Sequence, residues 1–573
     1  MKTHVTKFYL GLSIAFLLMS FQGRAEYDYS VSSLGPHHVT QGYRILFELN
    51  CTRTDTGNAS TLESLWTTLE NLPPHATIDW ADFGTYSNSF SATDGNKVYG
   101  STFKFAIGVQ TSPATPVGTY EITIRCKSGK TGVIRTEPYI IIVDPVQPLP
   151  VVTKTFCALP PLPDSLAFVS KMKSIGQHFC KDTADMQWDY DPTLVYYEIS
   201  DYLKDSASWL PCMRTARFTN RDMDSAYDRR NGFGRGLGII PARGLRPGYY
   251  IFSEGLYQDY IRTGDTLSRY AINLFATKAN FSDYNFPLGW LLSTTTSRET
   301  AYNSRTFIKC NDMGEHQHDK RLSYYLDMAL GHLDQWFYVH NSDYTRPFMV
   351  GLTLKTLIVY YNEVSPDPRI FPAVKMAADS LWKNFFVERN DSAAFKYTDV
   401  YTSTGDMTLE PDLNMLVGSA YAWIYHVTAD TSYLHKADKI FDGMVRTIIQ
   451  WDTKQYCQNF QWCFDYIKWR NNNPTDPSCS AARLALGIGE VSSATAFDIL
   501  PNPANSQVSL KYTLPNAQYT HMEIYEITGK KLSVIRDANE AEGEHQISVD
   551  LSAFPRGIYF VRFNNEVKKL VLQ

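Results

Sequence analysis

The order of hydrophobic and polar residues divides the chain into three parts. Over residues 26–144 apolar and polar residues alternate with a period of two, as in "YRILFELNC" and "TYEITIRC", and turn sequences separate these runs. We expect a small β-sandwich here, joined to the next part by the stiff, proline-rich linker "PVQPLPVV". The alternation returns over residues 497–573, in runs such as "HQISVDLSAFPRGIYFVRF", and predicts a second small β-sandwich.

Residues 156–485 carry a helical pattern in place of the alternation. Three stretches, which begin near Glu254, Val350 and Leu416, share one design: an amphipathic helix that contains glycine, a short turn with an aspartate, and a second amphipathic helix rich in alanine. The aspartate of each turn can cap the helix that follows it. The three turns are Thr263-Gly264-Asp265, Ser365-Pro366-Asp367 and Thr428-Ala429-Asp430. Repeated helical hairpins of this kind predict a solenoid or a closed ring of hairpins.

The first 25 residues predict export. Lys2 and Lys7 precede an apolar stretch, and the small residues Gly23 and Ala25 lie at the expected cleavage positions. The apolar stretch is too short to span a bilayer. We therefore expect a signal peptide at residues 1–25 and no transmembrane segment after its removal. The formal net charge of −5 provides no basic surface for nucleic acid.

Nine cysteines follow the predicted signal peptide, in a compartment where disulfides can form. Cys51 and Cys126 end two predicted strands and suit a bridge across the first sandwich. The other pairs that we expect are Cys457 with Cys463 and Cys157 with Cys180. The odd count leaves at least one thiol unpaired unless it bonds to another chain.

Three segments resemble known families. The segment "SPATPVGTYEITIRC" is similar to the late strands of immunoglobulin-like modules of bacterial surface enzymes, which implies an immunoglobulin-like β-sandwich at residues 26–144. The helical hairpins resemble those of the (α/α) toroid enzymes, the six-hairpin glycosidase and polysaccharide lyase superfamily, and imply an all-α toroid at residues 156–485 that carries the activity.

The third resemblance concerns residues 497–573. Their elements Asn502-Pro503-Ala504, "EIYEITGKKL", "VDLSAFPRGIYFVRF" and "VKKLVLQ" resemble the type A C-terminal sorting domain of type IX secretion cargo. The resemblance implies that the type IX secretion machinery is a partner of this region. It also implies that the protein is secreted or held at the bacterial cell surface.

The toroid resemblance implies an active site at one end of the ring, where the helices that lead into the aspartate turns begin. Three separate segments project there: "GYYIFSEG", "HNSDYTRPFMVG" and "TGDMTLEPDLNMLVG". Cleavage of a glycosidic bond commonly needs two carboxyl groups, one protonated and one ionised. The candidate catalytic residues are Glu254, Asp343, Glu410 and Asp412. Acidic residues at helix N-termini also serve simply to cap amides and offset the helix dipole, so the alternative for each is a structural role.

A competing chemistry is β-elimination on a uronic acid polymer, which needs a Tyr or His base and a cation that neutralises the uronate carboxylate. Tyr344 with Arg346, and the loop that holds His316, offer such groups. The candidate substrate-binding residues are Tyr250, Trp290, His316, Tyr344, Arg346 and Asn414.

Acidic residues dominate the expected mouth, which favours a glycoside hydrolase that acts on a polysaccharide. The remaining alternative is a surface protein that only binds glycan or host protein, on aromatic platforms such as Trp290 and Trp336. We predict no cofactor and no metal site, because His316 and His318 have no obvious third ligand beside them.

Overall fold

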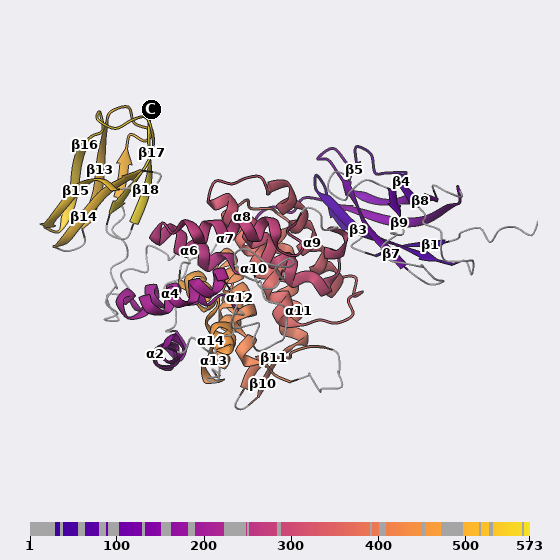
Figure 1. Cartoon of the computed structure of the whole chain (residues 1–573), viewed down its shortest axis with the longest axis horizontal. Coiled ribbons are helices and arrows are strands. Elements are labelled where there is room, and N and C mark those ends of the chain that lie inside the picture. Colours follow the sequence, from indigo (N-terminus) through magenta and orange to yellow (C-terminus); the bar gives the residue numbers. More distant parts are fainter. Residues whose placement is uncertain are drawn as a thin grey trace, which may run out of the picture. The chain divides into compact units, whose positions relative to one another are not determined.

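The computed structural model divides the chain into two compact units, Met1–Thr475 and Asp476–Gln573 (Figure 1). The predicted signal peptide lies outside the described residues. No described helix is long and apolar enough to cross a membrane. The structure describes residues 29–34, 38–54, 64–79, 87–89, 102–128, 132–150, 162–181, 190–222, 248, 251–283, 288–389, 392–399, 408–447, 453–471, 497–514, 517–526, 531–563 and 566–573.

The first unit begins with two β-sheets that share one hydrophobic core. One sheet has the strand order β1 (Tyr29–Leu34), β3 (Arg44–Arg53), β7 (Thr102–Gln110), β5 (Thr77–Asp79). The other has the order β2 (His38–Thr40), β9 (Ile134–Asp144), β8 (Gly118–Ser128), β4 (Ser64–Glu70), β6 (Ser87–Ser89). Alternate residues of β7 and β8, such as Ile107, Val109, Ile122 and Ile124, are fully buried between the sheets. The period-two pattern is therefore confirmed as strands with one inward face.

Cys51 of β3 and Cys126 of β8 lie next to each other across this core. Both are buried, and their thiols are hydrogen-bonded to each other, which raises the pKa of Cys51. The structure contains no disulfide between them, so it does not show the predicted bridge.

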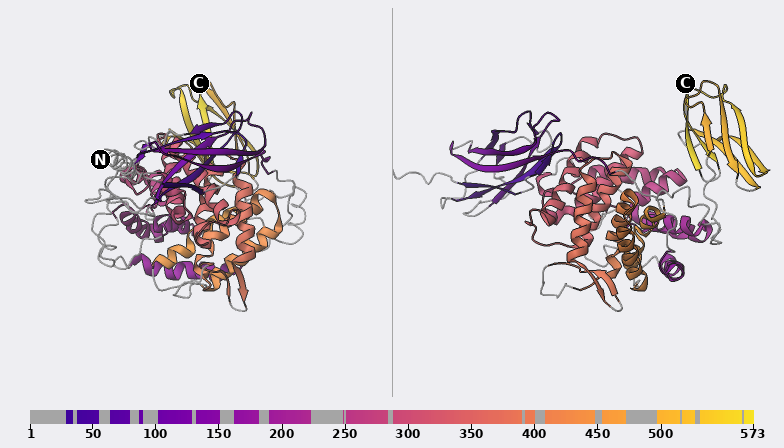
Figure 2. Two further views of the ribbon diagram at one scale, coloured as in Figure 1. Left: turned by 90° about the vertical axis from the view of Figure 1, so that its right-hand side faces the viewer. Right: turned by 180° about the vertical axis from the view of Figure 1, so that it is seen from behind.

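The second part of the first unit is helical. Its helices are α2 (Ser165–Lys181), α3 (Pro192–Leu203), α4 (Ser206–Asp222), α6 (Ser253–Thr263), α7 (Thr266–Lys278), α8 (Ser297–Asp312), α9 (Asp319–Phe337), α10 (Pro347–Glu363), α11 (Ile370–Asn384), α12 (Met415–Thr428), α13 (Thr431–Thr447), α14 (Thr453–Phe460) and α15 (Cys463–Asn471). A short hairpin, β10 (Phe386–Arg389) with β11 (Ser392–Phe395), projects at one end of the helices (Figures 1 and 2).

The turns between paired helices follow the sequence pattern. Gly264 ends α6 in the left-handed conformation (φ 73°), and the Asp265 carboxylate accepts a hydrogen bond from the amide of Leu267 at 2.9 Å. Ala429 adopts the same backbone conformation after α12 (φ 58°), and Asp430 then caps α13. The predicted hairpin turns are therefore confirmed at these positions.

The helices contact one another in a closed circuit. In chain order α3, α6, α8, α10 and α12 are successive neighbours, and α14 contacts both α12 and α3. Two glycines permit close crossings in this circuit. A Cβ atom on Gly255 would lie 2.3 Å from Asp191 Oδ1, and one on Gly351 would lie 2.2 Å from the Leu416 carbonyl oxygen. Neither position leaves room for a side chain.

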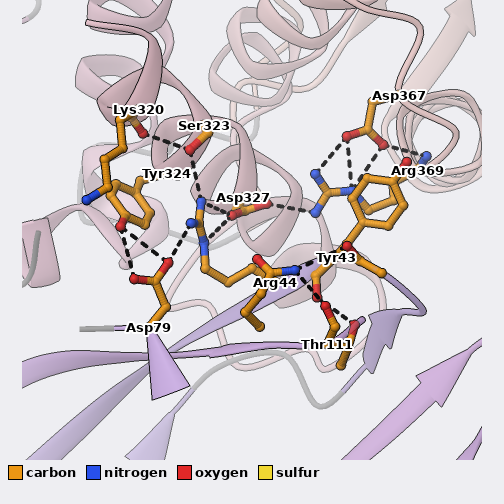
Figure 3. Close-up of polar contacts among 12 residues, drawn as sticks. Tyr43, Arg44, Asp79, Thr111, Lys320, Ser323, Tyr324, Asp327, Asp367 and Arg369 are labelled. Carbon is orange, nitrogen blue, oxygen red and sulfur yellow. Dashed lines mark hydrogen bonds and ion pairs between the residues drawn. The ribbon is translucent and has the colours of Figure 1, made fainter. Parts of the chain in front are cut away.

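The first β-sandwich docks on the helices through buried charges (Figure 3). Arg44 of β3 pairs with Asp79 of β5 at 2.8 Å and with Asp327 of α9 at 2.6 Å. Asp327 also pairs with Arg369, at 2.7 Å, directly before α11. The Tyr324 hydroxyl donates a hydrogen bond to Asp79 at 3.1 Å. The sandwich is thus held against the helical part by a shared ion-pair network.

The second unit is rich in strands. One sheet has the order β12 (Phe497–Leu500), β13 (Gln507–Leu514), β16 (Gly543–Asp550), and the other the order β15 (Lys531–Glu540), β14 (Gln518–Glu526), β17 (Gly557–Phe563), β18 (Glu566–Leu572). The predicted terminal strand is confirmed, since β18 pairs with β17 along its whole length and buries Leu570 and Leu572. Lys568 on this strand reaches Asp498 at 3.0 Å.

Candidate functional site

A cavity of about 260 Å³ lies where five helices begin. Most of its wall is formed by residues in or just before the first two turns of α3, α8, α10, α12 and α14, and Tyr397, which follows β11, completes it. The lining residues are Tyr190, Arg298, Tyr302, Phe348, Tyr397, Glu410, Asp412, Leu413, Gln455 and Gln458. Two of the four predicted catalytic carboxyl groups, those of Glu410 and Asp412, are therefore brought together in one cavity.

The Glu410–Asp412 pair is the chemically distinctive feature of this cavity. Gln458 donates a hydrogen bond to Asp412 Oδ2 at 2.5 Å, and the Thr408 hydroxyl donates one to Glu410 Oε1 at 2.9 Å. Burial, and then the neighbouring Glu410 carboxyl group, raises the pKa of Asp412 to about 6. The buried Asp412 Oδ1 accepts no hydrogen bond from a described donor, and a proton shared with Glu410 would satisfy it. The pair thus keeps a proton up to about pH 6.

The backbone around the pair is fixed by local sequence. Pro411 starts a short 3₁₀ turn, Pro411–Leu413, in which the Leu413 amide donates to the Glu410 carbonyl at 3.0 Å. Asn414, fully buried, then donates from Nδ2 to the carbonyls of Ala393 and Ile440 at 2.8 and 3.0 Å. We predicted Asn414 to bind substrate. It instead ties the site loop to β11 and α13.

Aromatic rings form much of the cavity wall. Tyr397 stacks on Phe348 with a centroid separation of 5.6 Å, and the Arg346 guanidinium lies 5.2 Å from the centre of the Tyr397 ring. Arg346 also lies 4.5 Å from the centre of the Tyr344 ring. Neither Arg346 nor Tyr344, both predicted to bind substrate, lines the cavity, and Arg346 lies between the rings of Tyr344 and Tyr397. Aromatic faces of this kind can pack against the apolar faces of a sugar ring.

Beneath Tyr302 the interior of the helical part is charged. The Arg305 guanidinium lies 4.7 Å from the centre of the Tyr302 ring and pairs with Glu254 at 2.6 Å. Burial alone would raise the pKa of Glu254, but the charges of Arg305, Lys355 and Lys309 outweigh it, and that pKa lies below its ordinary value. Glu254 is thus an ionised partner of Arg305, does not line the cavity, and cannot serve as the proton donor there.

The remaining predicted residues lie elsewhere. Asp343 is exposed in the loop before α10 and does not line the cavity. His316, a predicted substrate-binding residue, follows the other end of α8 in a separate cavity with Asp312 and Glu363 and does not line the Glu410–Asp412 cavity. Tyr250 lies outside the described residues. Trp290 belongs to the 3₁₀ turn Leu288–Leu291, and its side chain is outside the described part of the structure.

The sequence analysis missed several lining residues. Gln455 and Gln458 belong to "QYCQNFQWC", where we predicted only a disulfide between Cys457 and Cys463. That prediction is wrong, because the structure forms no disulfide between these two cysteines. The Cys463 thiol donates instead to the Asn459 carbonyl at 2.7 Å. The pair predicted between Cys157 and Cys180 lies outside the described side chains, and Cys212 is disulfide-bonded.

The polar stripe of α8 was the sequence signal available for the others. Arg298, Tyr302, Arg305 and Lys309 recur at helical spacing and face inward, on a helix whose other residues are also mostly buried. A buried helix with a regular charged stripe indicates a polar interior next to a site.

Comparisons with known proteins identify the second unit. Residues 498–573 match the family described as "Secretion system C-terminal sorting domain". The chain is therefore cargo of the type IX secretion machinery and is delivered to the cell surface or beyond it. No curated protein matches the chain.

Solved structures give only weak similarity. A family 123 glycoside hydrolase from Clostridium perfringens is 15% identical with a TM-score of 0.15, over 22% of this chain and 28% of that one. The fragment of Escherichia coli alpha-2-macroglobulin from domain MG7 to the C-terminus is 10% identical with a TM-score of 0.24, over 96% of this chain and 100% of the fragment. Salmonella alpha-2-macroglobulin is 9% identical with a TM-score of 0.24, over 95% of this chain and 40% of that one. The chain thus spans less than half of the family 123 enzyme and of the Salmonella protein.

Proposed function

We propose that the exported protein is a glycoside hydrolase that acts on a polysaccharide, with its active site at the Glu410–Asp412 cavity. In this proposal the closed circuit of helices is an (α/α) toroid and the first sandwich is an accessory module. The observation that carries the proposal is the pair itself: a buried carboxyl group with a pKa of about 6 beside a second carboxyl group. A carboxylic acid whose pKa is raised toward neutral pH is what a general acid for glycoside cleavage requires.

In the proposed reaction Asp412 donates its proton to the oxygen of the leaving sugar. The Glu410 carboxylate then stabilises the positive charge that develops on the sugar ring. A water molecule adds to the anomeric carbon, and its proton returns to Asp412, so the enzyme is regenerated. Gln458 holds Asp412 in place through its hydrogen bond at 2.5 Å. The volume of about 260 Å³ lies below the usual range for drug-sized ligands, which suits a single sugar residue between the aromatic walls.

A second candidate function is β-elimination on a uronic acid polymer. Arg298 and Tyr302 support it, because they line the same cavity one turn apart on α8. A guanidinium group can neutralise a uronate carboxylate, and a tyrosine hydroxyl can exchange the proton at the neighbouring carbon.

The two reactions leave different products. The protein is incubated with a panel of neutral and acidic polysaccharides while reducing ends and the ultraviolet absorbance of unsaturated sugars are followed together. New reducing ends without absorbance support hydrolysis, and absorbance that rises with them supports elimination. Asp412→Asn should abolish hydrolysis and Glu410→Gln should reduce it strongly, whereas Asp343→Asn, an exposed carboxyl outside the cavity, should leave it unchanged. Binding without any product would contradict both reactions and favour a glycan-binding surface protein.

A further inference from the structure

A larger cavity, of about 450 Å³, lies between the first sandwich and the helical part. The sandwich contributes β2, β3 and the segment after β9, and the helical part contributes α9 and α11. Most of the wall is apolar, with Val39 and Leu46 on one side and Leu330, Pro372 and Met376 on the other. Cavities of this volume at the interface of two packed parts are common ligand sites.

At one end of this cavity the positive charges are paired with carboxylates. Arg44 and Arg369 line it, and both are engaged by carboxylates, Arg44 by Asp79 and Asp327 and Arg369 by Asp327 and Asp367 (Figure 3). Two guanidinium groups thus face three carboxylates. This end offers no uncompensated positive charge that would attract an anion.

The other end is acidic. Both ring nitrogens of His38 are hydrogen-bonded. Nδ1 lies 2.7 Å from an Asp144 carboxylate oxygen and Nε2 lies 2.7 Å from the Tyr338 hydroxyl, so His38 has no ring nitrogen left for another partner. The Asp334 carboxylate lines the same end but receives no hydrogen bond from a described residue. Burial raises the pKa of Asp334 to about 6; the charge of His38 opposes this shift, and the charge of Asp144 adds to it.

The position of Asp334 on its helix adds to this imbalance. Asp334 lies in the last turn of α9, where the helix dipole presents its negative end. A cation at this place would meet the dipole, the Asp334 carboxylate and the charge of Asp144 together. A positively charged ligand would therefore supply a partner that the described residues do not.

We propose that the cavity between the sandwich and the helices binds a small organic cation, an amine with an apolar body, whose ammonium group pairs with Asp334. The apolar body lies against Leu330 and Met376, and the ammonium group donates to the Asp334 carboxylate. Such a ligand contacts both parts of the first unit and strengthens their docking. This site is separate from the Glu410–Asp412 cavity and shares no lining residue with it.

The test is isothermal titration calorimetry of the full chain with n-hexylammonium. Hexanoate and hexanol, which have the same chain length but a negative and a neutral head group, are the controls. We expect n-hexylammonium to bind at least tenfold more tightly than either. Asp334→Asn, which keeps the shape of the side chain, should weaken n-hexylammonium about tenfold. Met376→Trp should block all binding by filling the cavity; if that variant does not fold, Ala373→Leu takes its place.

Several results would overturn the proposal. They are equal affinity for hexanoate, no heat of binding at any pH from 6 to 8, and unchanged affinity in Asp334→Asn. Activity on polysaccharide should be the same in Asp334→Asn as in the unmodified protein. The titration therefore tests the amine site alone, and the activity assay tests the proposed hydrolysis alone.

Discussion

Replacing Asp412 by asparagine should make the protein more stable at neutral pH. The structure raises the pKa of Asp412 from 3.8 to about 6, and each pKa unit corresponds to 1.36 kcal/mol, so holding this carboxylate ionised costs roughly 3 kcal/mol. Between those two pH values the folded protein binds more protons than the unfolded chain. The free energy of unfolding therefore falls as the pH rises through this window.

The substitution Asp412→Asn removes the charge and keeps an oxygen that can accept the hydrogen bond from Gln458. At pH 7.5 we expect the free energy of unfolding to rise by up to about 3 kcal/mol, and at pH 4 by little, because the native carboxyl group is then protonated. Urea unfolding followed by tryptophan fluorescence at both pH values measures the difference. Asp343→Asn serves as the matched control. An equal effect of Asp412→Asn at the two pH values, or a loss of stability at pH 7.5, would refute the reasoning.

The same pair sets the pH dependence of catalysis. In the unmodified protein, activity should fall above pH about 6, as Asp412 loses the proton it donates. Glu410→Gln removes one cause of the raised pKa but leaves burial in place. Its residual activity should therefore fall at a lower pH. A falling limb that does not move in this variant would show that another group controls it.

Three further outcomes are expected. Gly351→Ala places a methyl group against the Leu416 carbonyl, and should lower the thermal midpoint through a loss of several kcal/mol, as overpacking in a core does. Asp327→Ala leaves two buried guanidinium groups without their shared partner and should cost about 3–5 kcal/mol in urea unfolding, whereas the exposed Asp343 should tolerate alanine. Exported protein should contain a Cys51–Cys126 disulfide, seen by mass spectrometry without reduction. Its loop should stabilise the fold by about 4 kcal/mol over the reduced protein, and free thiols in exported protein would contradict this.

The sequence predicted those features that depend on interactions between residues close together in the chain. Period-two runs became strands, and the aspartate turns became hairpins, because left-handed backbone at Gly264 and capping by Asp265 need no distant partner. Glu410 and Asp412 were found because Pro411 marks a start of helical backbone at the expected mouth.

What the sequence could not predict depends on distant packing. His316 is two residues past a glycine turn, and only the direction of α8 shows that it lies at the far end from the mouth. Asparagine side chains often bind sugar hydroxyls, so the sequence alone suggested that role for Asn414. Only its hydrogen bonds to two carbonyl groups, one from a segment before it in the chain and one from a segment after it, reveal its structural role. Gln458 reaches Asp412 from 46 residues further along, a pairing that no local pattern encodes.

The last strand of the sorting domain is held on both of its edges. On one edge β18 pairs with β17, and on the other the Asn502 side chain donates to the Lys569 carbonyl at 2.6 Å and accepts from the Val571 amide at 2.9 Å. Asn502 thus takes the place of a neighbouring strand and covers an edge that could otherwise recruit another chain. The export address is consequently a three-dimensional surface assembled from residues about 70 positions apart. We therefore expect recognition at the outer membrane to require that this unit is folded, so that export would also be a check on folding.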